Sequence, residues 1–125
     1  MIREATISKC GRYRFSLSRV WEPLPAPQVC WIMLNPSTAD SMKDDPTIRR
    51  CIEFTKRWGY GGLVVVNLFA FRAADPNTMM HVDDPIGDGC GQAISNAAKC
   101  ASLVIAAWGT LGAWRGRGQD IWAKL

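Results

Sequence analysis

The sequence predicts an α/β protein, and three features of the chain lead to that class. First, residues 29–34 and 63–66 are apolar and rich in β-branched side chains, which is typical of strands covered on both faces. Second, residues 46–58 between them carry apolar side chains at helical spacing. Third, residues 103–108 form another apolar segment after a second helical pattern. We therefore expect a three-layer α/β/α fold around a central parallel sheet, preceded by an N-terminal β-hairpin.

Length and composition limit the classes of protein that remain. The 125 residues fit a single domain spanning 1–125, and 48% hydrophobic with 21% charged residues exclude a disordered chain. No apolar stretch approaches the roughly 18 to 20 residues of a bilayer span, and the first twenty residues lack an apolar signal segment. We expect a soluble, cytoplasmic protein with no membrane partner. Its five cysteines contain no C-x-x-C pair, which favours reduced thiols.

Residues 1–28 form the predicted hairpin and a proline-rich connector. Polar and apolar residues alternate from Ile2 to Val20, and Cys10-Gly11 is placed to make the turn. The alternation puts Tyr13, Phe15 and Leu17 on one face. It puts the polar residues on the opposite face, namely Arg12, Arg14, Ser16 and Ser18. The three prolines of residues 22–28 then favour an extended connector.

The predicted parallel-sheet core spans residues 29–125. Its first helix has clear ends, because Asp45-Pro46 is an N-cap followed by proline at the first helical position, and Gly59 suits a C-terminal left-handed residue. With the strands on either side, this helix has the size of a right-handed parallel crossover unit. After a long polar loop over 72–87, a second helix is expected within 88–100.

The carboxyl-terminal part of the chain is predicted to be incomplete. A glycine-rich turn region over 109–118 follows the strand at 103–108, and residues 119–125 begin another helical pattern. No strand follows to cover 103–108, so we expect a truncated chain that lacks its last parallel strand.

Candidate functional residues stand at the carboxyl ends of the three predicted parallel strands. In open α/β sheets, ligands bind in the crevice just beyond these ends. The three ends carry Asn35-Pro36-Ser37-Thr38, Asn67 and Trp108-Gly109. A buried carboxamide such as that of Asn67 needs partners, and it can pair with the edge of a pyrimidine base. The alternative is that these polar groups satisfy neighbouring backbone or cap turns.

Several longer motifs resemble a known family. They are 34–40 (LNPSTAD), 44–51 (DDPTIRRC), 58–62 (WGYGG), 66–72 (VNLFAFR) and 84–87 (DPIG). On these motifs the chain is identified as a member of the uncharacterised bacterial and phage family called domain of unknown function 1643. The resemblance covers nearly the whole chain.

A remoter resemblance concerns the uracil-DNA glycosylase superfamily, whose three strand ends are similar to those found here. The resemblance implies that Asn35 positions a hydrolytic water, that Asp40 is a base or electrostatic stabiliser, and that Asn67 selects the base. It also implies contacts to substrate from residues near these ends. They are Pro36, Ser37, Thr38, Phe69, Trp108 and Gly109, with Arg115 and Arg117 as phosphate ligands.

The expected partner is therefore DNA or a nucleotide, and three interpretations stay open. The chain is a glycosylase-like hydrolase of an N-glycosidic bond, a non-catalytic nucleic-acid or nucleotide binding module, or an inactive fragment. The third follows because a missing fourth strand would leave 103–108 as an exposed edge. The His-Pro loop of the superfamily is also absent, and His81 lies elsewhere in the sequence. No cofactor or metal is expected: residues 87–91 lack the strand that precedes a dinucleotide loop, and the lone histidine and dispersed cysteines lack zinc-site spacing.

Overall fold

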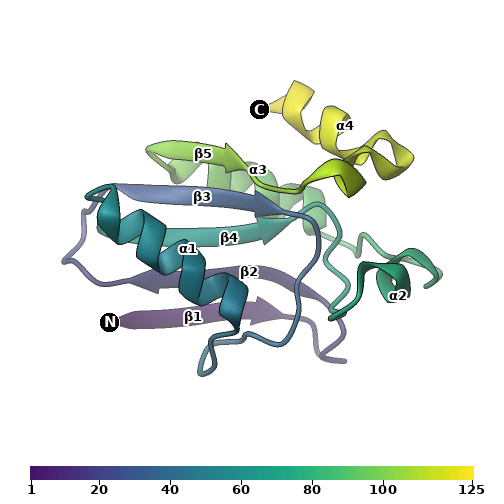
Figure 1. Cartoon of the computed structure of the whole chain (residues 1–125), viewed down its shortest axis with the longest axis horizontal. Helices are drawn as coiled ribbons and strands as arrows, with labels where there is room; N and C mark the ends of the chain where they lie inside the picture. Colours follow the sequence, from purple (N-terminus) through teal and green to yellow (C-terminus); the bar gives the residue numbers. More distant parts are fainter.

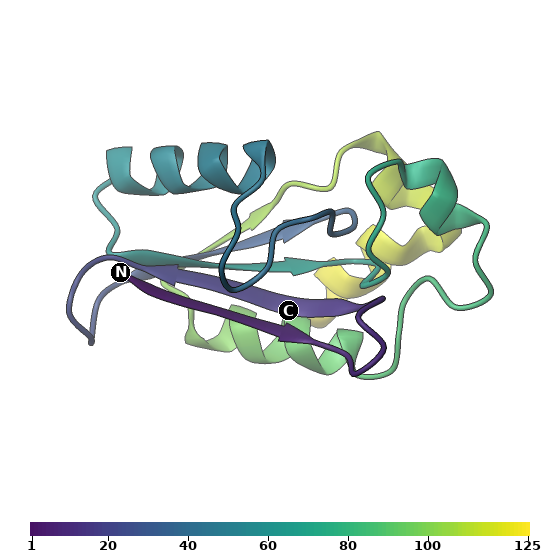
Figure 2. The same ribbon diagram turned by 90° about the horizontal axis from the view of Figure 1, so that it is seen from below.

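The computed structural model describes residues 1–125 and consists of one five-stranded sheet with helices on both of its faces (Figures 1 and 2). The strands are β1 (Ile2–Ile7), β2 (Arg14–Val20), β3 (Gln28–Met33), β4 (Gly62–Asn67) and β5 (Leu103–Ala106). Their order in the sheet is β1-β2-β4-β3-β5. β3 pairs in parallel with both β4 and β5, so the polar segments that follow these three strands emerge at one end of the sheet.

The helices are α1 (Pro46–Arg57), α2 (Pro76–Met80), α3 (Cys90–Cys100) and α4 (Arg117–Lys124), with a 3₁₀ helix η1 (Thr110–Gly116) before α4. α1 lies over one face of the sheet and α3 over the other (Figure 2). Side chains alternate along β3 between the two resulting cores: Val29 and Trp31 pack toward α1, whereas Cys30 and Ile32 pack toward α3. This explains the continuous apolar pattern of β3, since both faces of the strand are covered.

The α/β class and the β3-α1-β4 crossover unit are confirmed, but the prediction of a parallel sheet was wrong in part. The sheet is mixed, because β2 pairs antiparallel with both β1 and β4. The N-terminal hairpin therefore does not precede the sheet. It forms two of the five strands and covers the edge of β4 that the crossover unit leaves open.

A bulge in β2 corrects the predicted orientation of Arg14. Ile7 pairs with Arg14 and Thr6 pairs with Ser16, which leaves Phe15 as an extra residue in β2. One extra residue in a strand moves the residues on one side of it to the opposite face of the sheet. Arg14 therefore does not share the solvent side predicted from the alternation, and only 2% of its surface is exposed.

Two further predictions need correction. The loop over 72–87 contains the short helix α2, which begins at Pro76 after the N-cap Asp75. The strand predicted as buried over 103–108 is shorter, and β5 is an edge strand whose Leu103 and Ala106 are exposed. None of the helices combines the length and apolar character needed to cross a bilayer.

Candidate functional site

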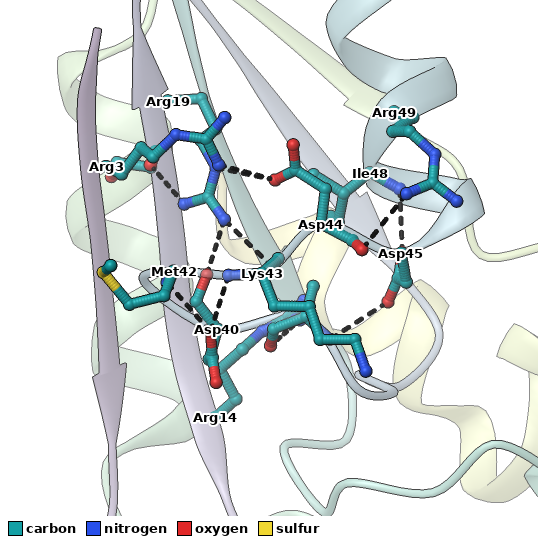
Figure 3. Close-up of polar contacts among 12 residues, drawn as sticks. Arg3, Arg14, Arg19, Asp40, Met42, Lys43, Asp44, Asp45, Ile48 and Arg49 are labelled. Carbon is teal, nitrogen blue, oxygen red and sulfur yellow. Dashed lines mark hydrogen bonds and ion pairs between the residues drawn. The ribbon is translucent and has the colours of Figure 1, made fainter.

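The candidate site is built on the segment that joins β3 to α1, residues 34–45, and a buried arginine anchors this segment to the sheet (Figure 3). Arg19 in β2 is fully buried. Its Nε donates to Asp44 Oδ1 over 2.9 Å, and Nη2 donates to the carbonyl oxygens of Asp40 and Lys43. The carboxylate of Asp44 thus balances the charge of Arg19, and the guanidinium fixes the path of the chain around it.

Asp45 ends this segment and begins α1. Its Oδ1 accepts a hydrogen bond from the amide of Ile48 over 2.9 Å, which is the expected N-cap contact. Its Oδ2 accepts a bond from the amide of Ala39 over 3.3 Å. One buried carboxylate therefore positions both the start of the helix and the middle of the preceding segment.

The segment and the ends of β3 and β4 enclose a pocket of about 210 Å³, called here the strand-end pocket. Four of the predicted site residues line it, namely Asn35, Pro36, Ser37 and Asn67. Asn35 and Asn67 are thirty-two positions apart in sequence, and the parallel pairing of β3 with β4 brings them together.

The NH₂ group of Asn35 is hydrogen-bonded within the protein, whereas its carboxamide oxygen is free. Its Nδ2 donates to the carbonyl oxygen of Ala73 over 2.8 Å and to that of Pro36 over 3.3 Å. These bonds join the start of the 34–45 segment to the chain that follows β4. The carboxamide oxygen accepts no hydrogen bond from the protein, so it can accept one from a guest in the pocket.

In Asn67 the free group of the carboxamide is the NH₂ donor, whereas in Asn35 it is the oxygen acceptor. Oδ1 of Asn67 lies 3.5 Å from Nη2 of Arg14, which also lines the strand-end pocket. A guanidinium has donors only, so this contact orients the amide oxygen toward Arg14 and leaves the NH₂ group as the free end. No protein atom accepts from that NH₂ group, although Asn67 is only 2% exposed. Asn67 thus presents a donor to the pocket.

Arg14 is the most unusual group at the site. Nη1 donates to the carbonyl oxygen of Ala39 over 3.1 Å, while Nε is buried without any hydrogen-bond partner. Burial lowers the pKa of Arg14 to about 10, although Asp45 acts in the opposite direction. The guanidinium is therefore still protonated at neutral pH and carries its charge inside the protein.

A second, open hollow of about 510 Å³ adjoins the strand-end pocket, and Ser37 lines both. The predicted residues Thr38 and Asp40 lie here and not in the strand-end pocket. Oδ1 of Asp40 accepts bonds from the amides of Met42 and Lys43, each over 2.8 Å. These bonds lower the pKa of Asp40, which weakens it as a base.

The remaining predicted residues lie away from the pocket, on the side of η1 and α4. Phe69 is fully buried, and its ring packs 5.1 Å from that of Trp114. Trp108 packs on Trp122, while Gly109 makes the exposed turn before η1. The neighbouring Ala107 is the residue of this strand end that does reach the pocket.

The two predicted phosphate ligands are also separate from the pocket. Arg117 donates from Nε to the carbonyl oxygen of Leu68 over 2.9 Å, so it supports the chain after β4. Arg115 is exposed, and its guanidinium lies over the ring of Trp114. The basic residues nearest the pocket are others: Arg12, Lys43 and Arg72 line the adjoining hollow.

Sequence reasoning missed Arg14 and Asp45 as pocket residues. Asp45 was recognisable as a helix cap, and its capping contact brings it to the pocket. Arg14 could not be found from the alternation, because the bulge in β2 is not visible in the residue pattern. No group of three or more His, Cys, Asp or Glu side chains is arranged to hold a metal ion.

Together, fold and site define an α/β protein with a small pocket, lined partly by polar side chains, at the carboxyl ends of two parallel strands. The chain belongs to a family described as protein of unknown function (DUF1643), whose model matches residues 14–125. This confirms the family predicted from the motifs. No significant match is found among curated proteins or among solved structures.

Proposed function

We propose that the strand-end pocket binds a nucleobase, either in a nucleic acid or in a nucleotide. The observation that carries this proposal is that Asn35 and Asn67 line one pocket of about 210 Å³ and offer it complementary groups, an acceptor and a donor. A planar base carries both donors and acceptors along its edge, so two oriented amides are suited to read it. The resemblance of the strand ends to the uracil-DNA glycosylase superfamily supports the same class of ligand.

The walls of the pocket suit the faces of a ring. Met33, Leu34 and Ile48 line it together with the two asparagines. Apolar walls with a few oriented polar groups are typical of small-molecule sites. Phosphates of the same ligand would lie over the adjoining hollow, where Arg12 and Lys43 supply positive charge.

Hydrolysis of an N-glycosidic bond is the reaction that this arrangement would support. The bond between C1′ of the sugar and the ring nitrogen breaks, and its electron pair leaves with the base. A water oxygen, oriented by the carboxamide oxygen of Asn35, forms the new bond to C1′ and releases its proton to solvent. Asp40 in the adjoining hollow would contribute negative charge beside the cation-like sugar.

The alternative is a binding module that performs no reaction. The bonds of Asn35 to Ala73 and Pro36 favour this alternative, because they give that side chain a structural role. The depressed pKa of Asp40 favours it too, since a weak base activates water poorly.

The experiment is an assay of oligonucleotides that carry uracil, mispaired pyrimidines or modified pyrimidines. Abasic-site formation and binding are measured for the wild type, Asn35→Ala and Asn67→Ala, with Asn77→Ala at an exposed position of α2 as the control. We expect Asn67→Ala to reduce discrimination between bases by about tenfold, the equivalent of one hydrogen bond. Circular dichroism and Tm verify that each variant is folded.

The outcomes separate the interpretations. Abasic product that Asn35→Ala abolishes supports hydrolysis, whereas base-selective binding without product supports the binding module. Equal binding of every base by wild type and Asn67→Ala would overturn the proposal of a nucleobase pocket.

A further inference from the structure

The hairpin strand β2 carries two buried arginines with contrasting environments. Arg19 is 0% exposed, and all three of its nitrogens have acceptors, one of them the carboxylate of Asp44. Arg14 is 2% exposed, but it forms no ion pair. Only two of the five N–H donors of its guanidinium are used, by Ala39 and Asn67. Each nitrogen of Arg19 thus has a hydrogen-bond acceptor in the protein, whereas Arg14 keeps unused donors.

A buried charge without an ion pair is costly, and burial lowers the pKa of Arg14 although Asp45 acts in the opposite direction. The other charged groups that act on Arg14 are Asp45, Arg72, Arg19 and Asp40. Neither aspartate forms an ion pair with Arg14, because both carboxylates bind backbone amides. Asp45 accepts from Ala39 and Ile48. Asp40 accepts from Met42 and Lys43. Arg14 lines the strand-end pocket, so the unused N–H groups of its two terminal nitrogens can donate to a guest there.

Two other positive features point to the same place. The NH₂ group of Asn67 is free there, and it is oriented by Arg14 itself. The first turn of α1 lines the pocket through Thr47 and Ile48, and helix N-termini carry partial positive charge, although the amide of Ile48 is already bound by the cap Asp45. The apolar walls described above would surround a ring better than a hydrated inorganic ion.

We propose that the strand-end pocket selects a flat heterocycle that carries a negatively charged oxygen, and that Arg14 is the residue that selects it. The inference rests on the proposed function and narrows its ligand to bases that are acidic enough to bind as anions or that leave as anions. The guanidinium and the Asn67 NH₂ group donate to the charged oxygen. The anion in turn supplies the ion pair that Arg14 lacks in the protein.

The first experiment measures binding of free bases to the full chain by calorimetry. The probes are uracil and 5-fluorouracil, whose ring N–H is more acidic, together with cytosine, which forms no anion near neutral pH, and inorganic phosphate. We expect 5-fluorouracil to bind more tightly as the pH rises and the ring loses its proton, with cytosine unaffected. Arg14→Lys should reduce 5-fluorouracil affinity about tenfold or more, because lysine lacks the planar set of N–H donors of the guanidinium. Arg50→Lys is the control, since Arg50 is exposed on α1 and lines neither the strand-end pocket nor the adjoining hollow.

The second experiment uses Asn67→Asp, which places a carboxylate where the amide oxygen meets Arg14. We expect this variant to melt several degrees above the wild type and to lose binding of 5-fluorouracil, because the protein then supplies its own counter-charge. This pairing of higher stability with lost binding distinguishes a ligand-selecting arginine from a merely structural one.

The results also separate this inference from the proposed function. If the bases bind with different affinities but 5-fluorouracil does not bind more tightly at higher pH and Arg14→Lys changes the binding of no base, the anion inference fails while the nucleobase pocket stands. If no base binds, both fail. Binding of phosphate alone also overturns the inference, because the guest is then not a heterocycle.

Discussion

Replacing Asp44 with asparagine should destabilise the protein through Arg19. The substitution keeps the shape of the side chain and an oxygen acceptor but removes its charge. Arg19 would then be a fully buried guanidinium with only neutral partners, namely carbonyl oxygens and the new amide. Breaking a buried pair by neutralising one partner leaves an uncompensated charge in a poorly solvated place.

The burial of Arg19 and Asp44 and the distance between them set the size of this loss of stability. The Arg19 side chain is 0% exposed, that of Asp44 is 16% exposed, and their atoms are 2.9 Å apart. Coulomb attraction at this distance is about 6 kcal/mol at an effective dielectric constant of about 20. The retained hydrogen bond and local relaxation recover part of it, so we expect a net loss of roughly 3 kcal/mol in the free energy of unfolding. The exposed pair of Arg3 with Asp44 adds little.

Urea unfolding followed by circular dichroism measures this loss. With a slope of about 2 kcal/mol/M, the midpoint should fall by roughly 1.5 M urea. Asp83→Asn, at an exposed loop position, is the matched control and should leave the midpoint unchanged. If the two variants unfold at the same urea concentration, Arg19 does not depend on Asp44, and our account of how the 34–45 segment is held is wrong.

Two further predictions concern packing and thiol chemistry. Gly112→Ala would place a Cβ inside the indole of Trp108, 2.6 Å from its Cγ, and should cost about 1 to 3 kcal/mol in thermal or urea unfolding. Gly91→Ala, in the open on α3, should cost nothing, and equal effects would contradict this packing. At pH 8, iodoacetamide should label Cys10 in the native protein, because a serine hydroxyl lowers its thiol pKa at the surface. Burial raises the pKa of Cys30 to about 12, so mass spectrometry should find it labelled only in denaturant; native labelling of Cys30 ahead of Cys10 would refute this.

The elements that the sequence predicted well are those with strong local signals. α1 begins after Asp45 and reaches its C-cap at Trp58, one residue before the positive-φ Gly59, because capping and proline chemistry act over a few neighbouring residues. The same Asp-Pro signal occurs at Asp75-Pro76, but α2 has only five residues, too few to show a helical period.

The candidate site was partly predictable for a related reason. Parallel strands put the residues that follow them at one end of a sheet, so the meeting of Asn35 and Asn67 could be expected from the order of the elements. The contribution of Arg14 could not, because it depends on a bulge and on pairing between strands far apart in the chain. Phe69 and Trp108 were predicted from adjacency to the strand ends, whereas their rings pack into the interior beside η1 and α4.

The proposed chemistry depends on β2, because this strand carries Arg14 and its bulge at Phe15 turns Arg14 toward the pocket. A shortened protein starting at residue 29 would keep β3, α1 and β4 but would lose the only arginine that lines the strand-end pocket. It would also uncover the edge of β4 that β2 now protects. Without the bulge, Phe15 would pair with Ile7, and the regular alternation along β2 would point Arg14 toward the α3 side of the sheet. Protein engineers who wish to graft this pocket onto another scaffold must therefore transplant the irregularity together with the side chains.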